Sequence, residues 1–300
     1  MLGMGMHKIW REIVGEFLSD DHSIEDFIKD FRKPGGLNSR LASWEPREMS
    51  LRWYRTFLNL AFLTSTDETK HILQLMKGKI SLGKPIQGIG LFQEQLVEYN
   101  LDTILAVEEL SFVKRNLPNN PRCVAEIGPG FGRTTQIFLE LIKEIETYYI
   151  FDLPQTLEIS KKYLASTLSE ELFKKIFFSA DLTDFEGLTF DLGIQINGLQ
   201  EMSEEVITNL YFKFFDNCEF VYLKNPVAKY LPEHAGLDTK LSDVPLDVGR
   251  SRDIVDIWNL STLKDQCISH VIAYKPLRHQ LITWEQERLF PHFCNVLYSK

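Results

Sequence analysis

The chain has 300 residues, enough for one large domain or two smaller ones. Its hydrophobic fraction of 44% and charged fraction of 25% allow a sizeable core. The net charge of −9 gives an acidic surface, which repels phosphate backbones and disfavours nucleic acid as a partner.

Four cysteines lie far apart in the sequence without a C-x-x-C pair, and they indicate free thiols in a reducing compartment. The first seven residues show no signal-peptide pattern, and no stretch approaches the length of a membrane span. These features predict a cytoplasmic protein.

The first 117 residues have the spacing of apolar side chains that is typical of helices. We expect this region to be a helical cap, which could cover a ligand cleft or form the interface of a homodimer. Helices are predicted, in chain order, over residues 9–18, 24–31, 46–62, 72–76 and 92–112.

Pro118-Asn-Asn-Pro121 marks a boundary, after which strands and helices alternate. This alternation predicts a parallel sheet in a second domain of residues 118–300. His270–Tyr274 and Gln280–Trp284, separated by a short Lys-Pro-Leu-Arg turn, can form a final antiparallel hairpin. The strands before them are predicted over Cys123–Ile127, Tyr148–Phe151, Ile176–Phe178, Leu192–Ile196 and Phe220–Leu223.

A glycine-rich turn follows the first of these strands, in the sequence Glu126-Ile-Gly-Pro-Gly-Phe-Gly-Arg133. Gly128, Gly130 and Gly132 let the backbone approach a ligand closely and aim free N–H groups at it. The nicotinamide fingerprint requires its third glycine at position 133, where this chain has arginine. The G-x-G-x-G spacing, with an acid two residues before it, resembles instead the first motif of class I S-adenosylmethionine (SAM) methyltransferases.

Acidic side chains follow the next two strands, at the strand ends where open α/β sheets bind their ligands. Asp152, with Leu153 beside it, can accept hydrogen bonds from both hydroxyls of a ribose. Asp181 can accept from an adenine amino group, and Leu182 can pack on the ring. Glu126 is expected near a cationic sulfonium, because a cation relieves the repulsion among carboxylates. Either aspartate could alternatively cap a helix or a turn.

Three segments resemble a family of sugar O-methyltransferases, within a similarity that covers mainly residues 85–230. They are Glu126–Gly132, Tyr149–Leu157 and Gln195–Ser203, where Gly198 replaces the family's usual serine. The resemblance implies a Rossmann-like class I methyltransferase sheet with a C-terminal antiparallel hairpin. It also implies SAM as cofactor and methylation of a sugar hydroxyl, on a nucleotide sugar or glycan precursor. Two alternatives stay open: a SAM-dependent methyltransferase of a non-sugar small molecule, and an inactive SAM-binding partner subunit.

Methyl transfer needs an aligned acceptor, and a weakly nucleophilic hydroxyl benefits from a general base. Glu201, after the fourth strand, is the first candidate, although it could instead stabilise the start of the next helix. His234, in a long irregular stretch, and His279, in the hairpin turn, are further candidates. Asn197 is expected to contact the cofactor or orient a hydroxyl. Glu233 could join Glu201 and His234 around a divalent metal, but no spacing demands it and no metal site is predicted.

Overall fold

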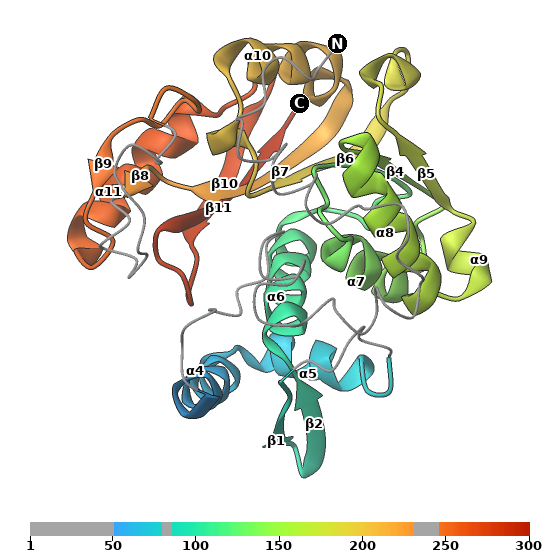
Figure 1. Cartoon of the computed structure of the whole chain (residues 1–300), viewed down its shortest axis with the longest axis vertical. Coiled ribbons are helices and arrows are strands. Elements are labelled where there is room, and N and C mark those ends of the chain that lie inside the picture. Colours follow the sequence, from blue (N-terminus) through green and yellow to red (C-terminus); the bar gives the residue numbers. More distant parts are fainter. Residues whose placement is uncertain (1–50, 80–85, 231–245) are drawn as a thin grey trace.

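The computed structural model of the protein describes residues 51–79, 86–230 and 246–300. A seven-stranded sheet, in the order β10-β11-β7-β6-β3-β4-β5, has helices on both faces (Figure 1). Its strands are β3 (Cys123–Ile127), β4 (Thr147–Phe151), β5 (Ile176–Ser179), β6 (Phe190–Ile196), β7 (Cys218–Pro226), β10 (Gln280–Gln286) and β11 (Phe293–Ser299). The five strands expected before the final hairpin are therefore confirmed.

Five neighbouring strands of the sheet, β5, β4, β3, β6 and β7, run parallel to one another. Strand β11 pairs antiparallel with both β7 and β10. The C-terminal hairpin is thus confirmed, but its first predicted strand is wrong. His270–Tyr274 lies at the end of helix α11 (Leu260–Ala273). Leu263, Cys267 and Val271 recur at helical spacing and bury one face of α11, which explains why the segment is helical.

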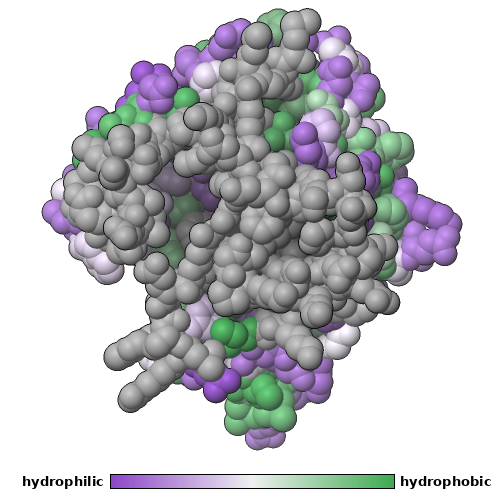
Figure 2. Space-filling model, viewed as in Figure 1, coloured by the Kyte–Doolittle hydropathy of each residue, from purple (hydrophilic) through white to green (hydrophobic). Residues whose placement is uncertain are grey.

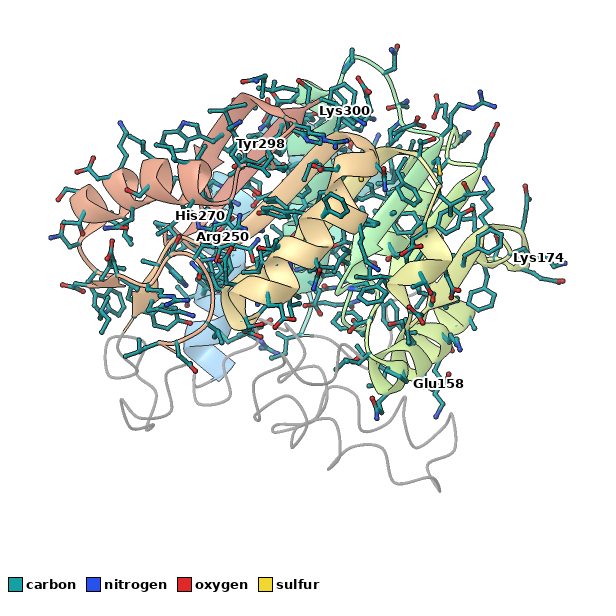
Figure 3. All side chains as sticks on the ribbon, turned by 90° about the horizontal axis from the view of Figure 1, so that it is seen from above. Glu158, Lys174, Arg250, His270, Tyr298 and Lys300 are labelled. Carbon is teal, nitrogen blue, oxygen red and sulfur yellow. The ribbon has the colours of Figure 1, made fainter. Side chains whose placement is uncertain are left out.

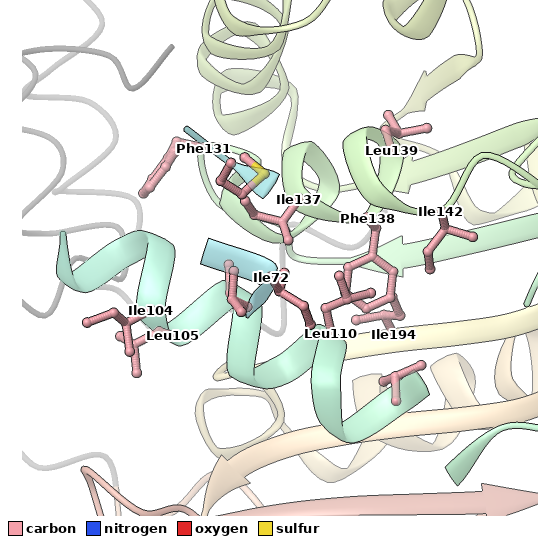
Figure 4. Packing of buried hydrophobic residues seen from close by; sticks show 14 of the residues in the cluster. Ile72, Ile104, Leu105, Leu110, Phe131, Ile137, Phe138, Leu139, Ile142 and Ile194 are labelled. Atoms are coloured by element: carbon pink, nitrogen blue, oxygen red, sulfur yellow. The ribbon is translucent and has the colours of Figure 1, made fainter. Parts of the chain in front are cut away.

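Each face of the sheet has its own hydrophobic core, because side chains alternate along the strands. Helices α6 (Leu101–Asn116), α7 (Arg133–Leu141) and α8 (Pro154–Thr167) cover one face. There Leu110 and Phe138 lie beside Ile194 of β6 (Figure 4).

Helices α10 (Glu204–Lys213) and α11 cover the opposite face of the sheet. In the view from above, Glu158 of α8 and His270 of α11 lie far apart, with strands between them (Figure 3). Shorter elements complete the second half of the chain: α9 (Glu170–Phe173), η2 (Leu182–Phe185), η3 (Leu199–Glu201), η4 (Phe215–Asn217), β8 (Lys229–Tyr230) and β9 (Ile254–Val255).

The N-terminal region is only partly helical where the structure describes it. Helices α4 (Leu51–Thr64) and α5 (Asp67–Leu75) match two predicted helices, whereas those before residue 51 lie outside the described residues. The predicted helix over 92–112 is wrong in its first part. Here β1 (Gly88–Phe92) and β2 (Gln95–Tyr99) form a hairpin.

The turn of this hairpin explains why a helix does not form there. Gln93 and Glu94 have φ values of 49° and 62°, as in the two-residue turns whose twist suits antiparallel strands. The hairpin leaves Ile89, Leu91 and Leu96 exposed, and green apolar surface is visible at the lower end of Figure 2.

Two further expectations concern the chain as a whole. All four cysteines are free, as predicted. Among the described residues, every helix is too short or too polar to span a lipid bilayer.

The strand order places a topological switch point at the carboxyl edge of the sheet, where open α/β sheets have their ligand crevice. Neighbouring strands β3 and β6 lead into crossovers that run in opposite directions, from β3 to β4 and from β6 to β7. Ligands of open α/β sheets bind outside such a switch point. The antiparallel β11 between β7 and β10 is the topology of class I methyltransferases rather than of ordinary dinucleotide-binding domains, which confirms the predicted fold class.

Candidate functional site

The glycine-rich turn joins β3 to α7 at this carboxyl edge. Gly128, Gly130 and Gly132 have φ values of 69°, 61° and 102°, which residues with side chains rarely adopt. The Gly128 N–H donates to the Phe151 carbonyl oxygen at 2.9 Å and fixes the turn beside the end of β4. A Cβ at Gly128 would meet no described atom within 4 Å, whereas one at Gly132 would lie 2.9 Å from Leu164. The turn therefore requires its glycines, and its first glycine borders open space.

Asp152 follows β4 and lies against the glycine turn. Its carboxylate accepts a 2.7 Å hydrogen bond from the N–H of the half-buried Leu153 and another from the Gly130 N–H. Burial raises the pKa of Asp152 to about 7, against the effect of these two N–H donors. Additional hydroxyl donors would favour the ionised form, so the position suits the predicted contact with a ribose.

Asp181 and Leu182 follow β5 at the same edge. Asp181 is exposed, and its Oδ1 accepts a 3.0 Å hydrogen bond from the Thr183 N–H. This bond caps the short helix η2 and lowers the pKa of Asp181, so the turn-capping alternative is present. Leu182 is only 4% exposed and belongs to a core that includes Phe151 and Phe185, so little of its surface remains for an adenine ring.

Glu126 does not face the crevice, contrary to the expectation that it lies near a sulfonium. Strand alternation turns it toward α7, where its Oε2 accepts hydrogen bonds of 2.7 Å from Thr135 Oγ1 and from Tyr148 OH. Only 2% of the residue is exposed, and burial raises its pKa to about 7. Glu126 therefore fastens α7 to β3 and β4.

A buried charge cluster beside the turn was not predicted from the sequence. Glu109 of α6 accepts hydrogen bonds from Arg133 Nη2 at 2.7 Å, from Thr134 Oγ1 at 2.8 Å and from Lys224 Nζ at 3.0 Å. Burial opposes ionisation of Glu109, but the two cations and the hydrogen bonds outweigh it and lower its pKa. The available signal was Lys224, a cation that directly follows the apolar run Val221-Tyr-Leu223, whereas Arg133 precedes the polar residues Thr134, Thr135 and Gln136 and gave no signal.

The loop after β6 is held by side chains at the edge of the sheet. Asn197 has a φ of 56°, and its N–H donates to the Lys224 carbonyl oxygen at 2.8 Å. The buried Asn225 accepts 3.1 Å hydrogen bonds from the N–H groups of Gly198 and Leu199. Asn225 therefore shapes this loop, whereas the half-buried Asn197 stays at the edge where a cofactor contact was predicted.

Glu201, the first candidate for the general base, lies at this edge in η3 and is half-buried. Its neighbour Lys229 was not predicted from the sequence, and Lys229 Nζ donates a 2.5 Å hydrogen bond to the Gln200 carbonyl oxygen. Burial lowers the pKa of Lys229 to about 8, and the Glu201 carboxylate opposes this shift. An acid and a buried lysine thus lie together beyond β6 and β7.

The histidine candidates have different outcomes. His279 Nε2 lies 2.9 Å from the carbonyl oxygen of Cys218, the first residue of β7, so His279 is at the opposite edge of the sheet and its predicted catalytic role is wrong. The error follows from the misplaced hairpin. His234 lies outside the described residues, as does Glu233, and its role stays a prediction. Within the described ranges, no group of three or more potential metal ligands is present.

No protein-family model and no curated protein sequence matches this chain. Among solved structures, the methyltransferase domain of bacterial CtHen1 is similar at 17% identity, with a TM-score of 0.46 over 67% of this chain and 100% of that chain. Human N-acetylserotonin methyltransferase, solved with SAM, shows 11% identity and a TM-score of 0.43 over 67% and 53% of the two chains. Glycopeptide N-methyltransferase MtfA, solved with S-adenosyl-L-homocysteine (SAH), shows 16% identity and a TM-score of 0.43 over 64% and 88%. The fold class is defined by the order and direction of the strands in the sheet, and it does not rest on these similarities.

Proposed function

We propose that this protein is a SAM-dependent methyltransferase. One observation carries the proposal: a turn of three glycines with positive φ lies beside Asp152, at the switch point of a sheet with class I methyltransferase order. The turn can bring backbone N–H groups close to the amino-acid part of a ligand. In this proposal Asp152 accepts from ribose hydroxyls, and the second carboxylate oxygen of Asp181 accepts from an adenine amino group.

The chemistry requires little beyond alignment and proton removal. SAM, when bound, supplies an electrophilic methyl group on a good leaving group, so the protein has to orient the acceptor in line with it. A hydroxyl acceptor also needs a base within reach. Glu201 is our candidate, because it follows β6 at the same sheet edge as the glycine turn.

For the acceptor, we propose a sugar hydroxyl on a nucleotide sugar or glycan precursor. The support for this is the resemblance of the segments Glu126–Gly132, Tyr149–Leu157 and Gln195–Ser203 to sugar O-methyltransferases. All three segments lie at the carboxyl edge of the sheet or lead directly from it.

Calorimetry with SAH, followed by turnover assays with SAM, tests the proposal. The wild-type protein should bind SAH, and Asp152→Asn should weaken binding. Glu158→Gln, an exposed acid on the adjacent helix α8, serves as the matched control and should bind normally. Absence of SAH binding by the wild type would refute the proposal. Binding without turnover on sugar, phenol and amine acceptors would indicate an inactive partner subunit.

A further inference from the structure

Lys229 is a buried lysine at the carboxyl edge of the sheet, three residues beyond the end of β7. It belongs to the short strand β8, which pairs in parallel with β9, and only 6% of the residue is exposed. An ammonium carries three N–H groups, and among the described residues its one hydrogen-bond partner is the Gln200 carbonyl oxygen at 2.5 Å. Burying an ammonium with a single hydrogen bond is unfavourable, so nearby negative charge has to compensate for it.

Gln200 fixes the segment that carries Glu201. Its side-chain Oε1 accepts a 3.0 Å hydrogen bond from Tyr274 OH, and its Nε2 donates one of 3.0 Å to the Pro226 carbonyl oxygen. Its backbone carbonyl belongs to the peptide group that joins Gln200 to Glu201, and this is the carbonyl that accepts from Lys229. The ends of β7 and α11 thus hold η3 in place together with β8, and Lys229 bonds to the peptide group directly before Glu201.

The charged side chains that face the Lys229 ammonium come from two segments. Glu201 belongs to η3, whereas Asp247 and Arg252 belong to the segment that leads into β9. Burial lowers the pKa of Lys229 to about 8. The Glu201 carboxylate opposes this shift more strongly than Asp247 does, and Arg252 adds to it. Glu201 also raises the pKa of Tyr230, although burial has the larger effect there.

Lys229 itself is poorly suited to take a proton from an acceptor. With a pKa of about 8, its amine is mostly protonated at neutral pH, and an ammonium has no lone pair for a further proton. A carboxylate beside this ammonium has the complementary property, because the cation keeps it ionised and able to accept. Of the two carboxylates, Glu201 is half-buried and follows β6 at the edge that carries the glycine turn, whereas Asp247 is exposed.

We propose that Lys229 is a positioning residue for the methyl transfer, which fixes η3 through Gln200 and keeps the Glu201 carboxylate ionised as the base. The inference rests on the proposed methyltransferase function and on Glu201 as its base. It assigns Lys229 no contact with the acceptor, so it holds for any hydroxyl acceptor, a nucleotide sugar included.

NMR of the lysine side-chain ¹⁵N–H groups in the full chain tests the pairing without an acceptor. The pKa of Lys229 is measured in the wild type, in Glu201→Gln and in Glu205→Gln, whose exposed acid in the first turn of α10 makes it the matched control. Glu201→Gln should lower the pKa of Lys229, because it removes the carboxylate that favours the ammonium. Glu205→Gln should leave it unchanged. An equal pKa of Lys229 in the wild type and in Glu201→Gln would refute the pairing.

Steady-state kinetics tests the role in catalysis, with the acceptor that turns over fastest among the sugars, phenols and amines. Lys229→Met should move the acidic limb of the kcat pH profile upward by about 1 unit, so that kcat on that limb falls about tenfold. The KM for SAM should not change. Lys229→Arg keeps the charge and should keep the wild-type limb. Lys174→Met, at an exposed lysine far from Arg250 in Figure 3, is the matched control and should also keep it.

An unshifted limb in folded Lys229→Met, or an equal shift in Lys229→Arg, would overturn the proposed role of the charge. If Lys229→Met does not fold, the NMR comparison decides, because Glu201→Gln leaves the lysine in place. Absence of SAH binding by the wild type refutes the proposed function itself, whereas an unmoved pKa of Lys229 in a protein that binds SAH refutes this inference alone.

Discussion

Lys224 of β7 and Glu109 of α6 form a 3.0 Å ion pair in which both side chains are almost completely buried. The same carboxylate also holds Arg133 and Thr134, the first residues of α7 after the glycine turn. One acid thus connects the middle of the sheet, a covering helix and the start of the helix that follows the turn. Because Glu109 has two cationic partners, removing its charge should lower the free energy of unfolding by a different amount than removing either cation.

Glu109→Gln should destabilise the protein more than Lys224→Met. The first substitution leaves two buried cations without a counter-charge, which typically costs about 3–5 kcal/mol. The second leaves Glu109 paired with Arg133, so we expect about 1–3 kcal/mol. Urea unfolding of both variants measures the difference. Equal destabilisation would show that Arg133 does not compensate for the missing lysine.

The stability contributed by Glu126 should depend on pH. Burial raises its pKa from 4.5 to about 7, so the folded protein binds more protons than the unfolded chain between these values. The contribution is fully present below pH 4.5 and is lost as the pH rises through about 7. Glu126→Gln stays neutral at both pH values. The difference in free energy of unfolding between this variant and the wild type should therefore shift in favour of the variant by roughly 1–3 kcal/mol from pH 4.5 to pH 8. Denaturant unfolding at both pH values tests this, and a pH-independent difference would contradict it.

The affinity for SAH should rise with pH through about 7, because the hydrogen bonds of ribose hydroxyls favour the ionised form of Asp152. Asp152→Asn should weaken binding by about 1–3 kcal/mol and abolish this rise. Calorimetry in buffers of different ionisation enthalpy would also detect proton release by the wild type. An unchanged affinity in the variant would mean that the ribose contact is misassigned.

The parts of the fold that were predictable depend on local patterns. Short apolar runs bounded by turns located the five parallel strands, and the glycine spacing located the turn. The β1–β2 hairpin could not be found in this way, because Gln93 and Glu94 take positive φ in place of the glycine or asparagine that normally signals such a turn. The run from His270 to Tyr274 was ambiguous, since a short apolar segment fits a strand as well as the end of a helix.

The parts of the site that were not predictable depend on contacts between distant residues. Position in the sequence was enough to predict that Asp152 follows β4, but the direction of Glu126 depends on which sheet face α7 covers. Glu109 and Lys224 are 115 residues apart, and nothing local links them. His279 was misassigned because its distance from the crevice depends on which end of β7 it meets.

Glu201→Gln should lower kcat about 10²–10⁴-fold if Glu201 removes the proton of the acceptor hydroxyl. SAH affinity should not change, since the proposed cofactor contacts come from the turn and from Asp152. Glu205→Gln is the matched control, because this acid is exposed in the first turn of α10 and should retain full turnover. A structural role for Glu201 predicts a different result: a lower free energy of unfolding, with kcat unchanged for the protein that remains folded. Steady-state kinetics with SAM, combined with urea unfolding of both variants, separates the two roles, and retained kcat in Glu201→Gln would leave His234 as the remaining candidate base.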